Sequence, residues 1–383
     1  MSTLLRADRV VAPDRVLSRG WVAVEDDRIV AVGEGPPTDE AGVIGPAVDL
    51  GDAMVVAGFV DIHVHGGGGA TFGTGAEQDR RAIAFHRRHG TTTLQASLVS
   101  APVDQLVRQV RDLAELVADG DLAGVHLEGP WLSPARRGAH DPRFLRDPDP
   151  HDVEALLGAS PGAVGMVTLA PELRGGLDAV RAVVAAGARA AVGHTDADYG
   201  TVRAAREAGA SVATHLFNAM PPLGHRSPGP VTALLDDPGC VVELICDGVH
   251  LHPAVVHLAV AHAGAGRVAL ITDAMAAAGV GDGDFRLGSL AVRVTDGVAR
   301  LVDGGAIAGS TLTMDAAFRY VVDVVGVDPV SASAMASAVP AAVLGLDGDR
   351  GRLAAGQRAD LVVLSPDLQV RRVMLAGAWV ADT

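Results

Sequence analysis

Eight short apolar segments alternate with helical segments along the middle of the chain, and this alternation constrains the fold more strongly than any other feature of the sequence. The segments predicted as strands are Phe59–His65, Thr92–Ser97, Gly124–Glu128, Val164–Leu169, Ala188–His194, Ser211–Leu216, Val241–Asp247 and Val268–Asp273. Helices are predicted between them, for example at Ala76–His89, Val103–Ala118, Leu177–Ala186, Tyr199–Ala208 and Pro253–Ala263. Continuous apolar runs are typical of parallel strands that are buried on both faces. Eight strand–helix units over about 290 residues therefore predict an α/β fold, a (β/α)8 barrel of the TIM type, rather than a doubly wound sheet.

Both ends of the chain have a different pattern, in which short strands are separated by Gly and Pro. The predicted strands are Trp21–Val24, Arg28–Val32 and Val43–Leu50 near the start and Leu361–Leu364, Val370–Leu375 and Trp379–Val380 near the end. We expect the two ends to pair into one small β-sandwich domain, formed by residues 1–57 and 345–383, and residues 58–344 to form the barrel.

The chain contains no lysine, so all 31 of its basic residues are arginines, against 46 acidic residues and a net charge of −15. Chemistry that needs a lysine is therefore excluded, such as a Schiff base, a P-loop contact to phosphate, or a carboxylated lysine that bridges two metal ions. An acidic chain without a long basic run is also a poor binder of nucleic acids and of anionic membranes. Arginine remains as the side chain that can hold a phosphate or a carboxylate through its planar fork.

The sequence shows neither a long apolar stretch at its start nor an uncharged apolar run of about 18 residues. We therefore expect no signal peptide, no membrane span and a cytoplasmic location. Cys240 and Cys246 lie in one apolar run, so we expect two reduced core residues rather than a disulfide.

Histidine and acidic residues stand at the carboxyl ends of six predicted strands, which is the end that carries the active site in a (β/α)8 barrel. His63 and His65 lie two residues apart on a strand, so both side chains point to the same side. Asp273 could bind a metal ion or act as a general base. The full set of nitrogen and oxygen donors suits Zn2+ or Fe2+, with one or two ions per subunit, and consists of His63, His65, Glu128, His194 and His215.

Single residues of these types often have ordinary structural roles. We expect such roles for His86, His89, His151, His225, His252, His257 and His262. The role of His126 stays open. Asn218 could be a helix cap, and Arg226 could be a surface charge in its loop. The run Gly66–Gly69 fits a flexible turn better than a phosphate cradle.

Longer motifs extend this pattern over nearly the whole chain. In order they read AGFVDIHVHG from Ala57, HGTTT from His89, HLEGPW from His126, RGAH from Arg137, GHT from Gly193, THLFNAM from Thr214, DGVH from Asp247, TDA from Thr272, AGS from Ala308 and GQRADL from Gly356. With these motifs the chain resembles the amidohydrolase superfamily and, within it, the family of N-acetylglucosamine-6-phosphate deacetylases. The HxH pair and the last motif are shared across the superfamily, whereas HLEGPW and THLFNAMPP in combination are specific to the deacetylases.

The resemblance implies a metal-dependent hydrolase that converts N-acetyl-D-glucosamine 6-phosphate into D-glucosamine 6-phosphate and acetate, in amino sugar catabolism or cell-wall recycling. It implies that Glu128, His194 and His215 bind the main catalytic metal. The HxH pair would add capacity for a second ion. Asp273 would be the catalytic acid and base in an attack by a metal-held hydroxide.

The resemblance also implies a substrate site and a homodimer. The residues that would contact the sugar phosphate are Ala139, His140, Asn218, Ala219, Arg226, His250, Ile307, Ala308 and Gly309. Arg226 and His250 would reach the phosphate from the neighbouring subunit. Arg137 stands where we expect lysine in many relatives, and this leaves the role of its guanidinium open.

Two other interpretations compete with this one. The chain could be another amidohydrolase that acts on N-acyl amino acids or cyclic amides, because Arg226 would serve a carboxylate as well as a phosphate. It could also be a noncatalytic sugar-phosphate sensor on the same scaffold. A sensor is expected to have lost metal ligands or Asp273, and the sequence has lost neither.

Overall fold

The computed structural model describes residues 2–36 and 47–381. Contacts within the chain group it into two units, which we describe separately. One unit contains residues 1–61, 86–93 and 313–383, and the other contains residues 62–85 and 94–312. This grouping places residues 313–344 in the terminal unit. The predicted domains, residues 1–57 with 345–383 and residues 58–344, stay a prediction.

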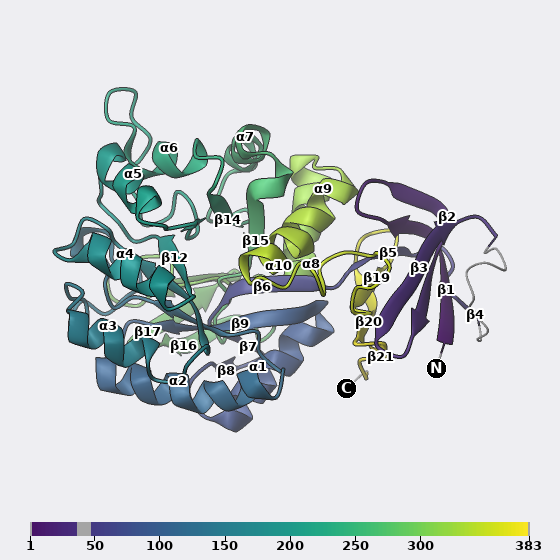
Figure 1. Cartoon of the computed structure of the whole chain (residues 1–383), viewed down its shortest axis with the longest axis horizontal. Coiled ribbons are helices and arrows are strands. Elements are labelled where there is room, and N and C mark those ends of the chain that lie inside the picture. The colour runs from purple at the N-terminus through teal and green to yellow at the C-terminus, as the bar shows by residue number, and fades with distance from the viewer. Residues whose placement is uncertain (1, 37–46, 382–383) are drawn as a thin grey trace. The chain divides into compact units, whose positions relative to one another are not determined.

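Eight parallel strands form the barrel sheet, and their order in space follows their order in the chain (Figure 1). They are β6 (Phe59–Val64), β9 (Thr91–Val99), β10 (Val125–Glu128), β11 (Val164–Leu169), β12 (Arg189–Val192), β13 (Val212–Ala213), β14 (Val241–Ile245) and β15 (Val268–Ile271). The amide of Asp273, just beyond β15, donates to the carbonyl oxygen of His63 on β6 at 2.8 Å, so the last strand returns to the first. The predicted (β/α)8 barrel is confirmed.

Helices follow the barrel strands. They are α1 (Ala76–Arg88), α2 (Val103–Ala118), α3 (Pro150–Leu157), α4 (Gly176–Ala185), α5 (Tyr199–Glu207), α6 (Gly229–Leu235) and α7 (Pro253–Ala263). Of these, α1, α2, α4, α5 and α7 lie at the predicted places. In α2 the buried residues Leu106, Val110 and Leu113 recur at helical spacing, and each stabilises the fold by about 1.5–3 kcal/mol through burial. The sequence patterns did not predict α3 and α6, which are shorter helices.

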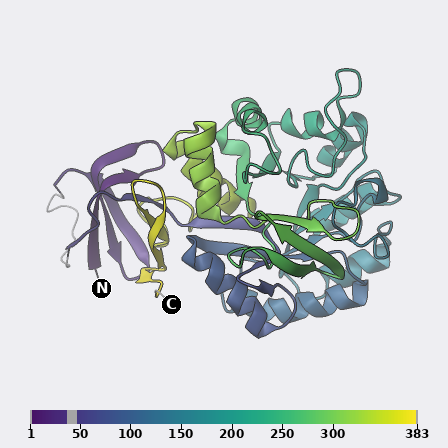
Figure 2. The same ribbon diagram turned by 180° about the vertical axis from the view of Figure 1, so that it is seen from behind.

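A three-stranded antiparallel sheet is inserted after β15, and no sequence pattern predicted it. Its strands are β16 (Gly283–Leu287), β17 (Leu290–Thr295) and β18 (Val298–Leu301), drawn in green in Figure 2. Its buried residues Leu287 and Val292 form one apolar cluster with Met275, which lies in the loop after β15. A two-stranded ribbon of β7 (Gly66–Gly67) and β8 (Ala70–Thr71) follows β6.

The terminal unit contains a sheet built from both ends of the chain. Its described strands are β1 (Ser2–Val11), β2 (Val16–Glu25), β3 (Arg28–Glu34), β4 (Ala47–Asp49), β5 (Met54–Ala57), β19 (Leu361–Leu364), β20 (Val370–Leu375) and β21 (Ala378–Trp379). Antiparallel pairing of β19 with β5 joins the two ends. Buried residues from β1, β2, β3, β5, β19 and β20 form one core cluster, so the predicted small domain from both termini is present.

Some details of this sheet differ from the prediction. Strands β1 and β5 were not predicted, and residues 43–46 of the predicted strand Val43–Leu50 lie outside the described residues. The terminal unit also contains short helices, α8 (Met314–Tyr320), α9 (Pro329–Ser333) and α10 (Val339–Val343). Cys240 and Cys246 are buried and free, as predicted. Within the described residues, no helix has both the length and the apolar composition needed to cross a membrane.

Candidate active site

Glu128, the last residue of β10, is the centre of a buried cluster of histidines. Its Oε1 atom lies 3.0 Å from Nε2 of His215, 3.1 Å from Nε2 of His194 and 3.5 Å from Nε2 of His63. Its Oε2 atom lies 3.1 Å from Nε2 of His65 and 3.2 Å from Nε2 of His140. The barrel thus brings the five predicted metal ligands together, and adds His140.

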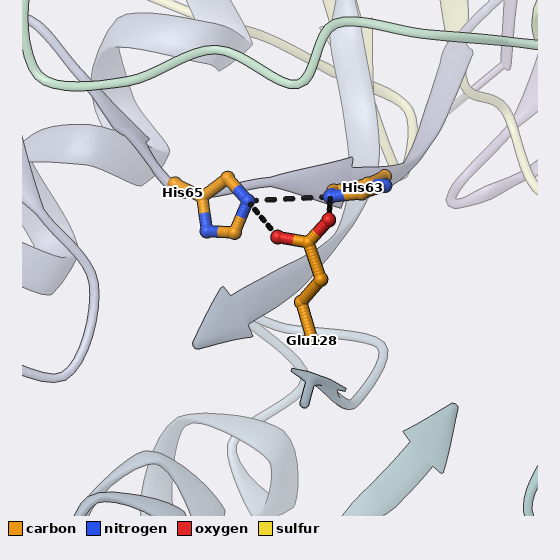
Figure 3. A group of neighbouring side chains, drawn as sticks. All are labelled: His63, His65 and Glu128. Atoms are coloured by element: carbon orange, nitrogen blue, oxygen red, sulfur yellow. Dashed lines mark hydrogen bonds and ion pairs between the residues drawn. The ribbon is translucent and has the colours of Figure 1, made fainter. Parts of the chain in front are cut away.

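His63 and His65 turn their rings toward Glu128 from the end of β6 (Figure 3). The two Nε2 atoms lie 3.2 Å apart, because residues at i and i+2 of a strand face the same side. All residues of β6 are buried in the barrel, so the strand fixes the position of this pair.

His194 and His215 reach Oε1 of Glu128, which also faces His63, from the loops that follow β12 and β13. Both residues have a positive φ, +46° for His194 and +28° for His215, which is rare for residues other than glycine. Backbone strain of this kind is concentrated at functional sites. Gly138, from the predicted RGAH motif, passes so close that a Cβ atom there would lie 3.0 Å from Cε1 of His194, which favours glycine at this position.

The spacing of the ligand atoms fits a divalent metal ion. The Nε2 atoms of His194 and His215 lie 3.0 Å apart, and those of His63 and His65 lie 3.2 Å apart. Two nitrogens held at roughly 2.0–2.1 Å from one tetrahedral ion are about 3.3 Å from each other. Two sets of three side chains have ligand atoms within 4.8 Å of one another, namely His63, His65, Glu128 and Glu128, His140, His194.

The second ring nitrogen of most of these histidines has its own partner. Nδ1 of His65 lies 3.1 Å from the carbonyl oxygen of Ser97, and Nδ1 of His194 lies 2.9 Å from that of Arg136. A carbonyl oxygen can only accept, so in both rings Nδ1 carries a proton, and the neutral form of each ring presents the lone pair of Nε2 to the cluster. This is the tautomer that a metal ion needs.

Opposite charges hold the central carboxylate ionised. Burial opposes ionisation of Glu128, but the charge of His63 and the contacts of His140 and His194 outweigh it and hold the pKa of Glu128 well below its ordinary value. Burial dominates at His140 and lowers its pKa to about 4, so this imidazole is neutral at neutral pH.

Asp273 follows β15 and faces the HxH pair. Its Oδ1 atom lies 3.2 Å from Nε2 of His65 and 3.6 Å from Nε2 of His63. Burial alone would raise the pKa of Asp273, but the neighbouring His63 and His65 hold it below its ordinary value, so the group is a carboxylate. Its backbone has a φ of +50°, and a Cβ atom on Gly309 would lie 2.9 Å from its carbonyl oxygen.

A cavity of about 240 Å³ opens above this cluster. Of the nine predicted substrate contacts, seven line it: Ala139, His140, Asn218, Ala219, His250, Ile307 and Gly309. Ala308 does not line it, because its side chain is fully buried in the apolar cluster under the inserted sheet. Arg226 does not line it either and is exposed in the loop before α6.

Two of the open alternatives can now be decided. Asn218 caps no helix in the described chain, and its side-chain amide donates to the carbonyl oxygen of His215 at 3.2 Å. The glycine run is a turn and not a phosphate cradle, because the amides of Gly66, Gly68 and Gly69 donate to backbone carbonyl oxygens of residues 274–278.

His250 lines the cavity of its own chain, although it was expected to act from a neighbouring subunit. Its Nδ1 atom lies 2.6 Å from Oδ2 of Asp247, and both side chains are largely buried. Burial would lower the pKa of His250, but the hydrogen bond to Asp247 and its charge outweigh burial and raise that pKa above the ordinary value. The cavity therefore contains a cationic imidazole.

His126, whose role the sequence left open, lies inside the barrel beneath the cluster. Its Nδ1 atom lies 2.9 Å from Oγ of Ser97 and its Nε2 atom 2.8 Å from Oγ1 of Thr168. Oγ1 of Thr168 lies 2.7 Å from that of Thr214, so the hydrogen bonds continue across the barrel. Burial lowers the pKa of His126 far below its ordinary value, so the ring is neutral and acts as a structural link.

The sequence patterns missed several residues of this site, among them Ile245 and Ala306, which line the cavity. Leu287, on β16, lines the cavity, and nothing in the local sequence indicates that an inserted hairpin reaches it. Glu243 contacts His63 at the base of the cluster. A carboxylate in the middle of the apolar strand VVELI was the signal that could have found Glu243.

Comparison with known proteins agrees with this geometry. The profile of the Amidohydrolase family matches residues 54–380. An N-acetylgalactosamine-6-phosphate deacetylase of Escherichia coli is 35% identical over 382 residues, which cover 98% of this chain and 99% of that protein. An N-acetylglucosamine-6-phosphate deacetylase of Vibrio furnissii is 36% identical over 341 residues, 88% of this chain and 85% of that protein.

Solved structures give the same result. An N-acetyl-D-glucosamine-6-phosphate deacetylase of Mycobacterium smegmatis was solved as an aspartate-to-alanine mutant in complex with N-acetyl-D-glucosamine-6-phosphate. It is 49% identical to this chain, covers 100% of both chains and superposes with a TM-score of 0.95. The corresponding enzyme of Thermotoga maritima is 32% identical, with 98% coverage of both chains and a TM-score of 0.88. The chain is therefore an enzyme of the amidohydrolase family, and within that family it belongs with the N-acetylglucosamine-6-phosphate deacetylases.

Proposed function

We propose that the enzyme removes the acetyl group of N-acetyl-D-glucosamine 6-phosphate and releases D-glucosamine 6-phosphate and acetate. The observation that carries this proposal is the cluster of Glu128 with its histidines and Asp273 at the base of one small cavity. The full-length similarity to a solved deacetylase that holds this sugar phosphate supports it.

The donor set supports a resident divalent ion, Zn2+ or Fe2+, with one or two ions in each subunit. Glu128, His194 and His215 would hold the main ion, and His63 and His65 would hold the second together with Glu128. An ion bound here supplies Lewis-acid polarisation and a water molecule of lowered pKa. Without lysine in the chain, Glu128 is the carboxylate that remains to be shared between two ions.

Asp273 is the proposed acid and base. Its carboxylate, held ionised by the histidines beside it, can take a proton from the attacking water. The same group can then return that proton to the nitrogen of the sugar, because an amide releases its amine only after protonation. One residue therefore serves both halves of the reaction.

His140 is placed to assist at the acetyl oxygen. The amide of Ser100 donates to Nδ1 of His140 at 3.3 Å, which leaves the ring proton on Nε2. That nitrogen lies beside Glu128 and belongs to the lining of the cavity, so it can donate a hydrogen bond to a substrate oxygen.

The 6-phosphate needs positive charge, and within the described residues no arginine lines the cavity. The cationic His250 is one partner for the phosphate. We propose that Arg226 supplies the rest from the neighbouring subunit of a homodimer, because its loop is exposed in the single chain. We also propose that the enzyme acts in the cytoplasm.

N-acetylgalactosamine 6-phosphate is a second candidate substrate, favoured by the relative in Escherichia coli that carries this activity in its name. Steady-state assays on both phosphorylated sugars, on unphosphorylated N-acetylglucosamine and on N-acyl amino acids test the proposal. The highest kcat/KM is expected for N-acetylglucosamine 6-phosphate. A preference for N-acyl amino acids would overturn it, and binding of the sugar phosphate without turnover in metal-replete protein would indicate a sensor.

A further inference from the structure

Glu243 is a carboxylate inside the barrel that the proposed reaction does not use. It stands in the middle of β14, where Val242, Leu244 and Ile245 are buried apolar neighbours, and its own side chain is 0% exposed. Its Oε2 atom lies 3.2 Å from Nδ1 of His63. The same Oε2 atom accepts a hydrogen bond from the amide of His215 at 3.1 Å.

The other oxygen of Glu243, Oε1, has no hydrogen-bond partner among the described residues. Burial of a carboxylate costs several kcal/mol unless hydrogen bonds or opposite charges compensate for it. An apolar side chain would fill this position in the barrel at lower cost. A half-satisfied carboxylate in this place therefore indicates a function for its charge.

The contact fixes the tautomer of His63. Oε2 of Glu243 already accepts from the amide of His215, so it is placed as an acceptor for a proton on Nδ1 of His63, which leaves Nε2 as the nitrogen that can bind a metal ion. That Nε2 atom faces the cluster, 3.2 Å from Nε2 of His65 and 3.5 Å from Oε1 of Glu128. Histidine ligands of metal ions are commonly oriented in this way by a carboxylate behind the ring.

His63 differs in this respect from the other ligands. The ring nitrogens of His65 and His194 that face away from the cluster lie against neutral carbonyl oxygens, and Nδ1 of His215 has no partner among the described residues. Only the His63 ring, of these four, has a carboxylate side chain behind it. A charged partner makes the opposite nitrogen a stronger donor to a metal ion.

We propose that Glu243 is the positioning residue of the second metal site, which fixes His63 as an Nε2 ligand and thereby sets the affinity of the ion held by His63 and His65. This inference rests on the proposal that the cluster binds divalent ions. The ion held by Glu128, His194 and His215 depends less on Glu243, which reaches that set only through the backbone amide of His215.

The test uses a Glu243→Gln variant. Glutamine keeps the shape of the side chain, and its oxygen can still accept from both His63 and the amide of His215, so only the charge is removed. Gln95→Leu is the matched control. Gln95 is also fully buried, also has an unpartnered oxygen, and contacts the carbonyl oxygen of Val125 rather than a proposed ligand.

Full-length wild type and both variants are stripped of metal and titrated with Co2+, while bound equivalents and the visible spectrum of the ion are recorded. We expect two equivalents in the wild type and in Gln95→Leu. In Glu243→Gln we expect the first equivalent unchanged and the second weakened roughly 10- to 100-fold, with the matching part of the spectrum lost. Kinetics at limiting metal should show a fall in kcat without a change in KM.

Three outcomes overturn the inference. The first is an unchanged affinity for both ions in Glu243→Gln. The second is a loss of both ions that is equally large in Glu243→Gln and in Gln95→Leu. The third is the binding of a single equivalent by the wild type. The last outcome leaves the proposed deacetylation intact, because one ion at Glu128, His194 and His215 can support it. Conversely, two ions without deacetylase activity would reject the proposed function and leave the role of Glu243 standing.

Discussion

The Asp247→Asn substitution tests how the cavity attracts an anion. Oδ1 of Asp247 accepts from the backbone amides of Val249 and His250 at 2.8 Å each, and Oδ2 faces Nδ1 of His250 at 2.6 Å. Asparagine can keep both backbone bonds through its oxygen. Its NH2 group then faces Nδ1 of His250, and this contact is a hydrogen bond only if Nδ1 is unprotonated. The variant therefore keeps the loop but makes His250 neutral.

The expected magnitude follows from this change. His250 keeps a proton on Nε2 and can still donate to the substrate, so the loss is the difference between a charged and a neutral hydrogen bond. That difference is about 1–2 kcal/mol, which corresponds to roughly a 5- to 30-fold rise in KM for the phosphorylated sugar. The value of kcat should stay close to that of the wild type, because His250 lies outside the histidine cluster around Glu128.

The pH dependence has a defined sign. The pKa of His250 is raised in the folded enzyme, so its charge is present below that pKa and is lost as the pH rises through it. KM of the wild type should therefore rise with pH above neutrality, and this rise should disappear in Asp247→Asn. Measurement of KM from pH 6 to pH 9 checks the expectation, with Asp284→Asn as a control that removes an exposed ion pair to Arg293. An unchanged KM, or an unchanged pH profile, in Asp247→Asn would refute the reasoning.

Three further predictions concern the cluster and the phosphate. Asp273→Asn should lower kcat by about 10²- to 10⁴-fold while the bound metal, measured by elemental analysis, is largely retained, and a near-normal kcat would contradict the acid and base role. Arg226→Ala should raise KM for the phosphorylated sugar strongly and leave turnover at saturation intact, whereas an unchanged KM would remove this arginine from the phosphate site. His63→Ala should lose one metal equivalent in the same analysis, and unchanged stoichiometry would argue against a second ion.

The sequence predicted those parts of the fold that depend on local patterns. A buried strand can be recognised from its apolar sequence alone. The strand Val164–Leu169, for example, was predicted at its observed bounds. That the histidines and Glu128 lie together was predictable, because parallel strands must bring their carboxyl ends together. The antiparallel sheet of Gly283–Leu301 was not predicted, because its burial depends on contacts with the loop after β15.

The geometry of individual side chains was less accessible from the sequence. The positive φ of His194, His215 and Asp273 was not indicated by any local pattern in the sequence. The role of the Glu243 carboxylate on β14 depends on its contact with His63 on β6, which lies 180 residues earlier in the sequence and which the barrel brings close. Arg226 was identified by resemblance, and the single chain leaves it exposed.

The short strand β13 has a consequence for the cohesion of the barrel. It pairs with β12 and with β14 over two residues on each side, whereas β10 pairs with β9 and with β11 over four residues. His194 follows β12 and His215 follows β13, so an ion that binds both would join these two strands beyond their short ladder. When the free concentration of an ion is 1,000 times its dissociation constant, its binding stabilises a folded chain by about 4 kcal/mol. The catalytic ion would thus also stabilise the barrel itself, at a pair of strands that share a short backbone ladder.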